Sequence, residues 1–353
     1  MSSRQFTFYL FENFDPASEH PLNPRRVLTS AVDGLLSMAA DGCAWDALCD
    51  AWGEERVRQV ADCGVLRRDG AMARLDAPVF LREDAPALSA AFSEDAERQA
   101  ELLSRVWPEI VRCADRLHNG FDASVNLYHI VCGMVMDGAF FDTLCEAGVV
   151  TTGRAHVSGL DYIAVAYERC EALDALSRRL LCSWNRAMGK TCTLQSFGDA
   201  DGDRFDAYRW YRLKESGQVI DNVPDLERLT REARRLVETG ICDRECLRAL
   251  TAFGYVTNGC LSVPVYHVQD MLMIDEIAEI VRSTLLEDTA AVLRRGVKDI
   301  TPVKHGVSAG ETANELYHLL FGRLNQVLVR RGMVAAPPMH PGEGRYLQSI
   351  MMA

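Results

Sequence analysis

Five arginines between residues 225 and 250 have the type and spacing that contact with phosphate groups requires. They are Arg228, Arg231, Arg235, Arg244 and Arg248. A guanidinium group is permanently charged and presents a planar fork of donors that matches phosphate oxygens. Arg67 and Arg68 add two more cations in the first part of the chain. These seven residues form our candidate nucleic-acid-binding site; the alternative is a solvated face on which they pair with neighbouring glutamates.

Two Tyr-His pairs, Tyr128-His129 and Tyr317-His318, contain side chains that could transfer protons. Adjacent residues on a helix point about 100° apart, so neither pair forms a catalytic constellation by itself. Their recurrence favours a repeated packing role over acid–base chemistry. The sequence therefore predicts no catalytic residue.

Metal and nucleotide motifs are incomplete in this chain. Asp199-Ala-Asp201-Gly202-Asp203 alternates carboxylates as a calcium loop does, but glycine stands fourth and Trp210 stands where the final glutamate belongs. Cys242 and Cys246 are not followed by a second ligand pair. Gly189-Lys190-Thr191 lacks the earlier glycine of a phosphate loop. We therefore expect no metal and no cofactor.

Charge is unevenly distributed along the 353 residues, whose formal net charge is −12. Residues 1–200 hold 29 acids and 19 bases, so their balance is −10. The remainder holds 50 − 29 = 21 acids and 38 − 19 = 19 bases, a balance of −2. Binding to phosphates requires local positive charge, so the second part of the chain is the better candidate.

Composition indicates a cytoplasmic protein. The chain contains 12 cysteines in no C-x-x-C pair, which suits reduced, packed thiols. No run of 18 apolar residues occurs, and the N-terminus lacks a signal-peptide pattern. We therefore expect no membrane segment.

Two short segments recur at nearly the same offset. Residues 127–133 read Leu-Tyr-His-Ile-Val-Cys-Gly and residues 316–322 read Leu-Tyr-His-Leu-Leu-Phe-Gly, an offset of 316 − 127 = 189. Residues 61–66 and 251–256 each carry a central glycine, at an offset of 254 − 64 = 190. Two matches at a shared offset indicate a duplicated unit.

Residues 25–81 show helical patterns up to Gly64, followed by a hairpin pattern at 65–75 around Asp69-Gly70. Helix, helix-turn-helix, hairpin is an order that resembles the winged-helix fold. Residues 225–268 repeat the last part, with a helix over 243–253 and a hairpin around Asn258-Gly259. The middle helix is missing or shortened in this second copy.

Further elements follow from periodicity. Residues 5–12, 191–197 and 205–213 read as strands, and residues 86–118 and 270–295 read as helices, the first with Pro108 as a candidate kink. Residues 337–345 read as a loop. From Ser158 to residue 190, apolar residues recur in steps of three and four, which predicts one long amphipathic helix. We expect this helix to bridge the two halves or to form a dimer interface.

The resulting fold prediction is mainly α with small β-hairpins (α+β), made of duplicated winged-helix-like modules in two related halves joined by a long amphipathic helix. The predicted parts are an N-terminal half 1–157 (modules 25–81 and 86–157), a connecting helix 158–190, and a C-terminal half 191–353 (strands 191–213, modules 225–268 and 270–353).

The leading functional expectation is a non-enzymatic, DNA-binding transcriptional regulator that dimerises through the 158–188 helix. The first alternative is an acidic winged-helix protein that binds another protein and not DNA. The second alternative is an enzyme of unknown class.

Overall fold

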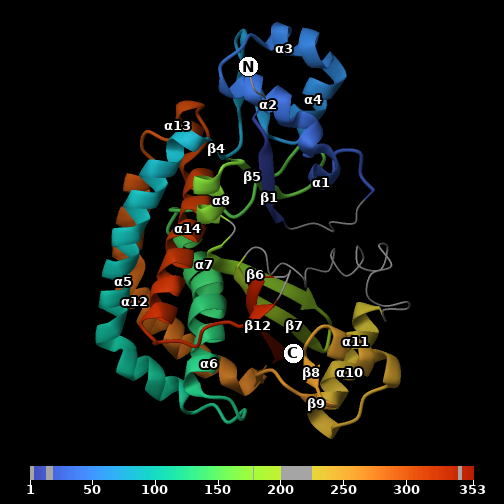
Figure 1. The fold of residues 1–353 in the computed structure, drawn as a ribbon, viewed down its shortest axis with the longest axis vertical. Coiled ribbons are helices and arrows are strands. Elements are labelled where there is room, and N and C mark those ends of the chain that lie inside the picture. The colour runs from blue at the N-terminus through green and yellow to red at the C-terminus, as the bar shows by residue number, and fades with distance from the viewer. Residues whose placement is uncertain (1–3, 13–18, 178, 200–224, 341–343) are drawn as a thin grey trace. The chain divides into compact units, whose positions relative to one another are not determined.

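The computed structural model describes residues 4–12, 19–177, 179–199, 225–340 and 344–353. The fold is mixed α and β, and the chain forms two compact units, each drawn from three stretches (Figure 1). The first unit comprises residues 1–95, 142–177 and 287–320. The second unit comprises residues 96–141, 178–286 and 321–353. Long helices therefore contribute residues to both units.

The helices are α1 (Pro24–Val27), η1 (Ser30–Val32), α2 (Asp33–Ala40), α3 (Trp45–Trp52), α4 (Glu54–Asp62), η2 (Arg82–Asp84), α5 (Ala85–Ala114), α6 (Ala123–Leu127), η3 (Tyr128–Ala139), α7 (Phe140–Glu146), α8 (Glu171–Ser177), α10 (Leu226–Thr239), α11 (Arg244–Ala252), η5 (Val268–Asp270), α12 (Met271–Gly296), α13 (Thr301–Lys304) and α14 (Ala309–Arg330). The strands are β1 (Phe6–Glu12), β2 (Leu66–Asp69), β3 (Met72–Leu75), β4 (Val79–Phe80), β5 (Tyr162–Glu168), β6 (Leu181–Met188), β7 (Cys192–Asp199), β8 (Val256–Thr257), β9 (Cys260–Leu261), β10 (Val265–Tyr266), β11 (Met339–His340) and β12 (Gly344–Met352).

The first unit contains a helix–hairpin module of α2, α3, α4 and the β2–β3 hairpin. Asp69 pairs with Met72, so the hairpin turns at Gly70-Ala71, where Gly70 has φ 61°. The hairpin expected at 65–75 is therefore confirmed, with its turn one residue later than Asp69-Gly70. Ala44, just before α3, forms an antiparallel bridge with Met72 of β3. The inward apolar residues of the three helices, including Leu36, are fully buried and hold the module together.

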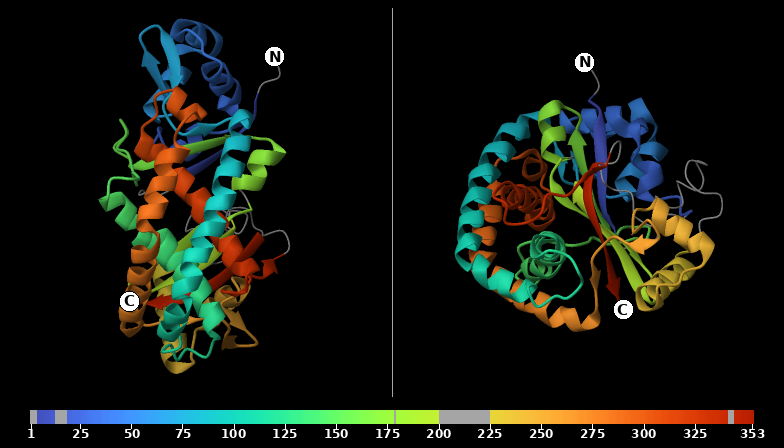
Figure 2. Two further views of the ribbon diagram at one scale, coloured as in Figure 1. Left: turned by 90° about the vertical axis from the view of Figure 1, so that its left-hand side faces the viewer. Right: turned by 60° about the horizontal axis from the view of Figure 1, so that its bottom comes forward.

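The second unit contains a shorter module of α10, α11 and the β8–β9 hairpin. Residues 240–243 alone separate its two helices, so the middle helix is absent here. Asn258 and Gly259 both have positive φ, as a two-residue hairpin turn requires. α10 packs against β6 and β7, and Figure 2 shows the module in two further views.

Each unit has a sheet with the same local order. In the first unit the order is β1-β5-β4, with β5 antiparallel to β1 and parallel to β4. In the second unit β12 is antiparallel to β7 and parallel to β10, within the order β10-β12-β7-β6. β5 is the first strand after the Leu-Tyr-His segment 127–133. β12 is the first strand longer than two residues after the Leu-Tyr-His segment 316–322.

The long helix expected at 158–190 is wrong. This stretch forms β5, α8 and β6 instead. All seven residues of β5 are buried, so both faces of the strand lie in the core and no period of two marks it in the sequence. Tyrosine, isoleucine and valine favour strands, and their spacing matched a helical period by coincidence. The expected homodimer interface relied on a 158–188 helix, and the structure does not contain this helix.

Three other expectations met different outcomes. The C-terminal loop expected at 337–345 contains β11, and the long β12 that follows was not predicted. Pro108 lies inside α5, which continues through it. The strand expected at 191–197 is confirmed as β7, whereas that at 205–213 lies outside the described residues.

Among the described residues, no helix is both long enough and apolar enough to cross a lipid bilayer.

Candidate functional site

The arginine-rich helices α10 and α11 have well-defined ends. Asp225 caps α10 by accepting a hydrogen bond from the Arg228 amide at 2.7 Å, and Gly240 ends the helix in the left-handed region at φ 70°. Asp243 caps α11 by accepting from the amides of Glu245 and Cys246. The hydrogen bond from Cys246 is the main cause that lowers the pKa of Asp243. Local capping therefore sets where the α11 arginines begin.

Two of the predicted phosphate contacts are already engaged between these helices. Arg228 of α10 lies 3.2 Å from the Asp243 carboxylate and 2.8 Å from that of Glu245. Arg235 lies 3.4 Å from Glu232, and that carboxylate accepts a hydrogen bond from the Asp243 amide at 3.0 Å. Arg228 therefore joins α10 to the start of α11 directly, whereas Arg235 pairs with Glu232 of its own helix, which contacts Asp243.

The other three predicted residues of this module are exposed. Arg231 lies on α10, and Arg244 and Arg248 lie four residues apart on one face of α11. Within the residues that the structure describes, neither Arg231 nor Arg244 has an ion-pair partner. α11 contains two bases and one acid, a balance of +1.

The corresponding helix of the first module carries the opposite charge. α4 contains three acids and two bases, a balance of −1, and it begins with the exposed residues Glu54 and Glu55. Arg58 of α4 pairs with Glu54 at 2.6 Å. In the hairpin, Arg68 lies 3.5 Å from Asp46 of α3. The first module therefore presents a more acidic helix face than the second.

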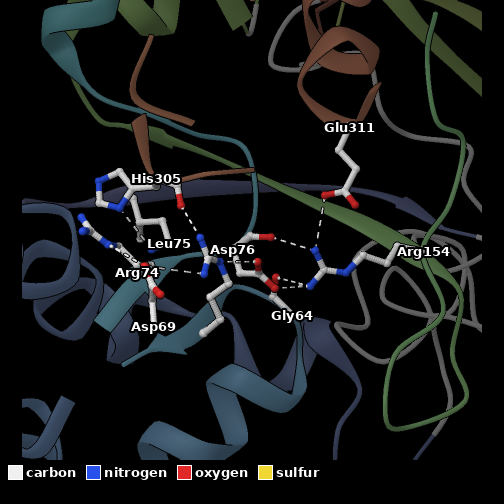
Figure 3. A network of polar contacts seen from close by, with 9 residues as sticks. Gly64, Asp69, Arg74, Leu75, Asp76, Arg154, His305 and Glu311 are labelled. Atoms are coloured by element: carbon white, nitrogen blue, oxygen red, sulfur yellow. Dashed lines mark hydrogen bonds and ion pairs between the residues drawn. The ribbon is translucent and has the colours of Figure 1, made fainter. Parts of the chain in front are cut away.

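Arg67, the remaining predicted contact, belongs to a network of polar contacts inside the first unit. Figure 3 labels other members of this network, among them Asp76 and His305. The Nε of Arg67 lies 3.2 Å from Asp76, and its Nη2 donates to the His305 carbonyl oxygen at 2.8 Å. The Leu75 amide donates to Nδ1 of His305 at 3.3 Å. Burial is the main cause that lowers the pKa of His305, with Arg74 adding to the effect. Arg67 therefore connects the hairpin to residues near α13.

Arg154 holds the other side of this network. Its guanidinium group lies 2.6 Å from the Asp76 carboxylate and 3.4 Å from that of Glu311, and it donates to the Gly64 carbonyl oxygen (Figure 3). Burial raises the pKa of Glu311, and Arg154 opposes that rise. Every charged group in this cluster has a partner, which indicates a structural role.

The two Tyr-His pairs adopt matching geometries in different surroundings. In each pair the ring centroids are 5.9 Å apart and the rings are inclined by 78°. Tyr128 and Tyr317 are fully buried, and the two histidines are nearly so. Nε2 of His129 has no hydrogen-bond partner among the described residues, and burial lowers the pKa of His129 to about 4. The matching geometry agrees with the packing role expected from the sequence.

A buried carboxyl group next to the second pair was missed by the sequence analysis. Glu315 on α14 is 6% exposed, and its Oε1 accepts a hydrogen bond from the hydroxyl of Tyr167 on β5. Burial raises the pKa of Glu315. A glutamate three residues before a buried histidine, on a mostly apolar helix, was the available signal.

Among the described residues, no group of three or more His, Cys, Asp or Glu side chains is arranged to hold a metal ion. Cys246 is buried within the α10–α11 core and Cys242 packs against that core. Residues 200–203 of the acidic turn lie outside the described residues.

Comparisons with known proteins identify no relative. No protein-family model, no curated protein and no solved structure matches this chain.

Proposed function

We propose that this protein is a non-enzymatic DNA-binding regulator that contacts the phosphate backbone through α11 of the second helix–hairpin module. The observation that carries the proposal is the exposed pair Arg244 and Arg248 on one face of a helix with a balance of +1. In helix-turn-helix proteins the second helix of the motif enters the major groove, and α11 is the second helix of this module. Arg231 on α10 extends the same set of exposed cations.

We further propose that residues 25–81 and 225–268 are related winged-helix modules and that the chain arose by duplication. Support comes from the matching local strand orders and the matching Tyr-His geometry. The Ala44–Met72 bridge adds a third strand position to the first hairpin, as in a winged helix. The second module has only two helices, so it is a reduced copy in this proposal.

The site residues are divided by role in this proposal. Arg231, Arg244 and Arg248 contact phosphates, whereas Arg228 and Arg235 position α11 through Asp243 and Glu232. Arg67 stabilises the first module, and Arg68 remains a candidate contact at its hairpin. A cytoplasmic location is part of the proposal and agrees with the free state of all 12 cysteines.

The test is binding of a fluorescent mixed-sequence DNA duplex, titrated with salt. The unaltered protein should bind at low salt, and the logarithm of its affinity should fall linearly with the logarithm of salt concentration. Arg244→Glu and Arg248→Glu should each weaken binding and lower that slope by about 1. Arg58→Glu on α4 is the matched control and should leave binding unchanged.

Two outcomes would overturn this assignment. Loss of affinity with Arg58→Glu but not with Arg244→Glu would place the interface on the first module. A lack of binding at low salt by the unaltered protein would reject DNA binding altogether.

A second candidate function is binding to another protein through the first module. The specific observation is the exposed acidic face at the α3–α4 junction, where Trp52 is 38% exposed beside Asp50 and Glu54. A basic, partly apolar surface would complement this face. Recovery of a stable complex from cell extract that Trp52→Ala disrupts, with no DNA binding in the first test, would favour this function.

A further inference from the structure

The environment of Glu315 in the first unit is unusual for a carboxyl group. The side chain lies in the core on α14, and Tyr167 of β5 donates its hydroxyl proton to Oε1. Tyr167 is itself held between aromatic rings: it stacks on Phe80 with centroids 5.0 Å apart and meets Tyr9 edge-on at 5.9 Å. Within the described residues, no arginine or lysine pairs with Glu315.

The second unit contains a neutral counterpart at the same place in the repeat. Glu315 lies three residues before His318, and Asn126 lies three residues before His129. Oδ1 of Asn126 accepts a hydrogen bond from the hydroxyl of Tyr266 at 3.1 Å, as Glu315 does from Tyr167. Asn126 is also bonded reciprocally to Asn119. An amide in the second unit and a carboxyl group in the first therefore each accept a hydrogen bond from a sheet tyrosine, on β10 and on β5 respectively.

We propose that Glu315 is a pH-responsive element of the first unit: its uncharged form holds α14 against β5, and loss of its proton weakens that contact. An ionised carboxylate without a cationic partner is costly in a protein core, whereas the un-ionised acid requires only hydrogen bonding. Asn126 cannot lose a proton, so the second unit lacks this response.

Two titratable groups act on the Glu315 carboxyl group. His318 lies one turn further along α14 and Tyr167 faces it from β5; both favour the ionised form and oppose the effect of burial. Glu311, one turn earlier on α14, is paired with Arg154. Desolvation is the largest of these effects, so the pKa of Glu315 is raised.

The direction of the pH response follows from proton linkage. When a local opening exposes Glu315, its pKa returns towards the ordinary 4.5, so the closed state binds more protons than the open state. The stabilising contribution of Glu315 to the closed state is therefore fully present below this ordinary pKa. It is lost as the pH rises towards the raised pKa. Above the raised pKa the loss levels off.

The experiment is hydrogen exchange by mass spectrometry across that pH range, corrected for the intrinsic exchange rate of each peptide. Protection of residues 162–168 and 309–320 should fall by up to about tenfold per pH unit in the unaltered protein. Glu315→Gln keeps an oxygen that accepts from Tyr167 and should abolish this dependence. Asn126→Asp is the matched variant, and it should create the same dependence in residues 123–139.

Results for the unaltered protein and for Glu315→Gln can each contradict the proposal. Equal pH dependence in the unaltered protein and Glu315→Gln would overturn the proposal, as would protection that does not change with pH in the unaltered protein. If Glu315→Gln does not fold, difference infrared spectroscopy can follow the carbonyl band of un-ionised carboxyl groups. In an Asp33→Asn, Glu311→Gln background, which removes the other two carboxyl groups of raised pKa among the described residues, that band should persist at pH values where exposed glutamates are already ionised. Its absence there would overturn the proposal.

Discussion

The two Leu-Tyr-His segments, residues 127–133 and 316–322, share a motif and differ in helix type and polar neighbours. The first belongs to η3, a run of π-helical turns, whereas the second lies in the regular helix α14. The tyrosine is fully buried in both, and the ring geometry is the same. The polar partner of the sheet tyrosine is an amide in one unit and a carboxyl group in the other.

This difference teaches that a shared apolar motif determines burial but not ionisation. A buried histidine with few charged neighbours loses affinity for its proton, as His129 does. A buried carboxyl group holds its proton more tightly, as Glu315 does. The two units should therefore respond to pH in opposite directions, and three predictions test how far the likeness extends.

The largest expected effect comes from truncating the motif tyrosines. Tyr128→Ala and Tyr317→Ala should each lower the free energy of unfolding by about 3–5 kcal/mol, because both side chains are fully buried and each leaves a cavity. Urea denaturation, with each unit followed by hydrogen exchange, measures the effect. Tyr128→Phe and Tyr317→Phe are the matched controls that keep the ring. A loss confined to one of the alanine variants would break the likeness between the segments.

Acid should destabilise the second unit through His129. The pKa of His129 is lowered from 6.5 to about 4, so the unfolded chain binds more protons between these values and stability falls as the pH falls. The loss should be on the order of 3 kcal/mol. His129→Phe should reduce this pH dependence in denaturant unfolding, whereas replacement of the exposed His118 by Gln should not. Unchanged acid sensitivity in His129→Phe would show that other groups cause it.

The smallest of the three effects concerns two glycines of positive φ, one before the first hairpin and one in the turn of the second. Gly64 has φ 69°, and a Cβ added there would lie 2.3 Å from His156. Gly64→Ala should therefore cost more than the about 1–2 kcal/mol of left-handed strain alone. Gly259→Ala is the control, because Gly259 has φ 80° with nothing within 4 Å. Thermal unfolding measures both variants; equal losses would mean that His156 moves aside without cost.

Local signals predicted part of this fold well. Gly70 and Asn258-Gly259 mark the hairpin turns because few residues other than glycine and asparagine accept positive φ. The helices at 85–114 and 271–296 follow from apolar periodicity over many turns. These elements depend on neighbouring residues along the chain, so the sequence contains most of the information that defines them.

Strands that pair with distant segments of the chain could not be predicted from local signals. β5 is buried on both faces between β1 and β4, and β12 lies between β7 and β10. A strand buried on both faces loses the alternation that identifies it. The site prediction met a similar limit: charge and type identified Arg228 and Arg244 alike, but only Arg228 has carboxylate partners among the described residues.

By itself, the sequence determined the turn positions, the long periodic helices and the repeated Tyr-His segments, because backbone preference and apolar spacing act over a few residues. Only the tertiary structure decided that residues 158–190 form strands around a short helix and that Arg67 joins a partly buried polar network. It also decided that Glu315 lies against Tyr167, 148 residues away in the chain. Such contacts depend on which distant segments meet in the core, where burial and unpaired charge have their largest energetic effects.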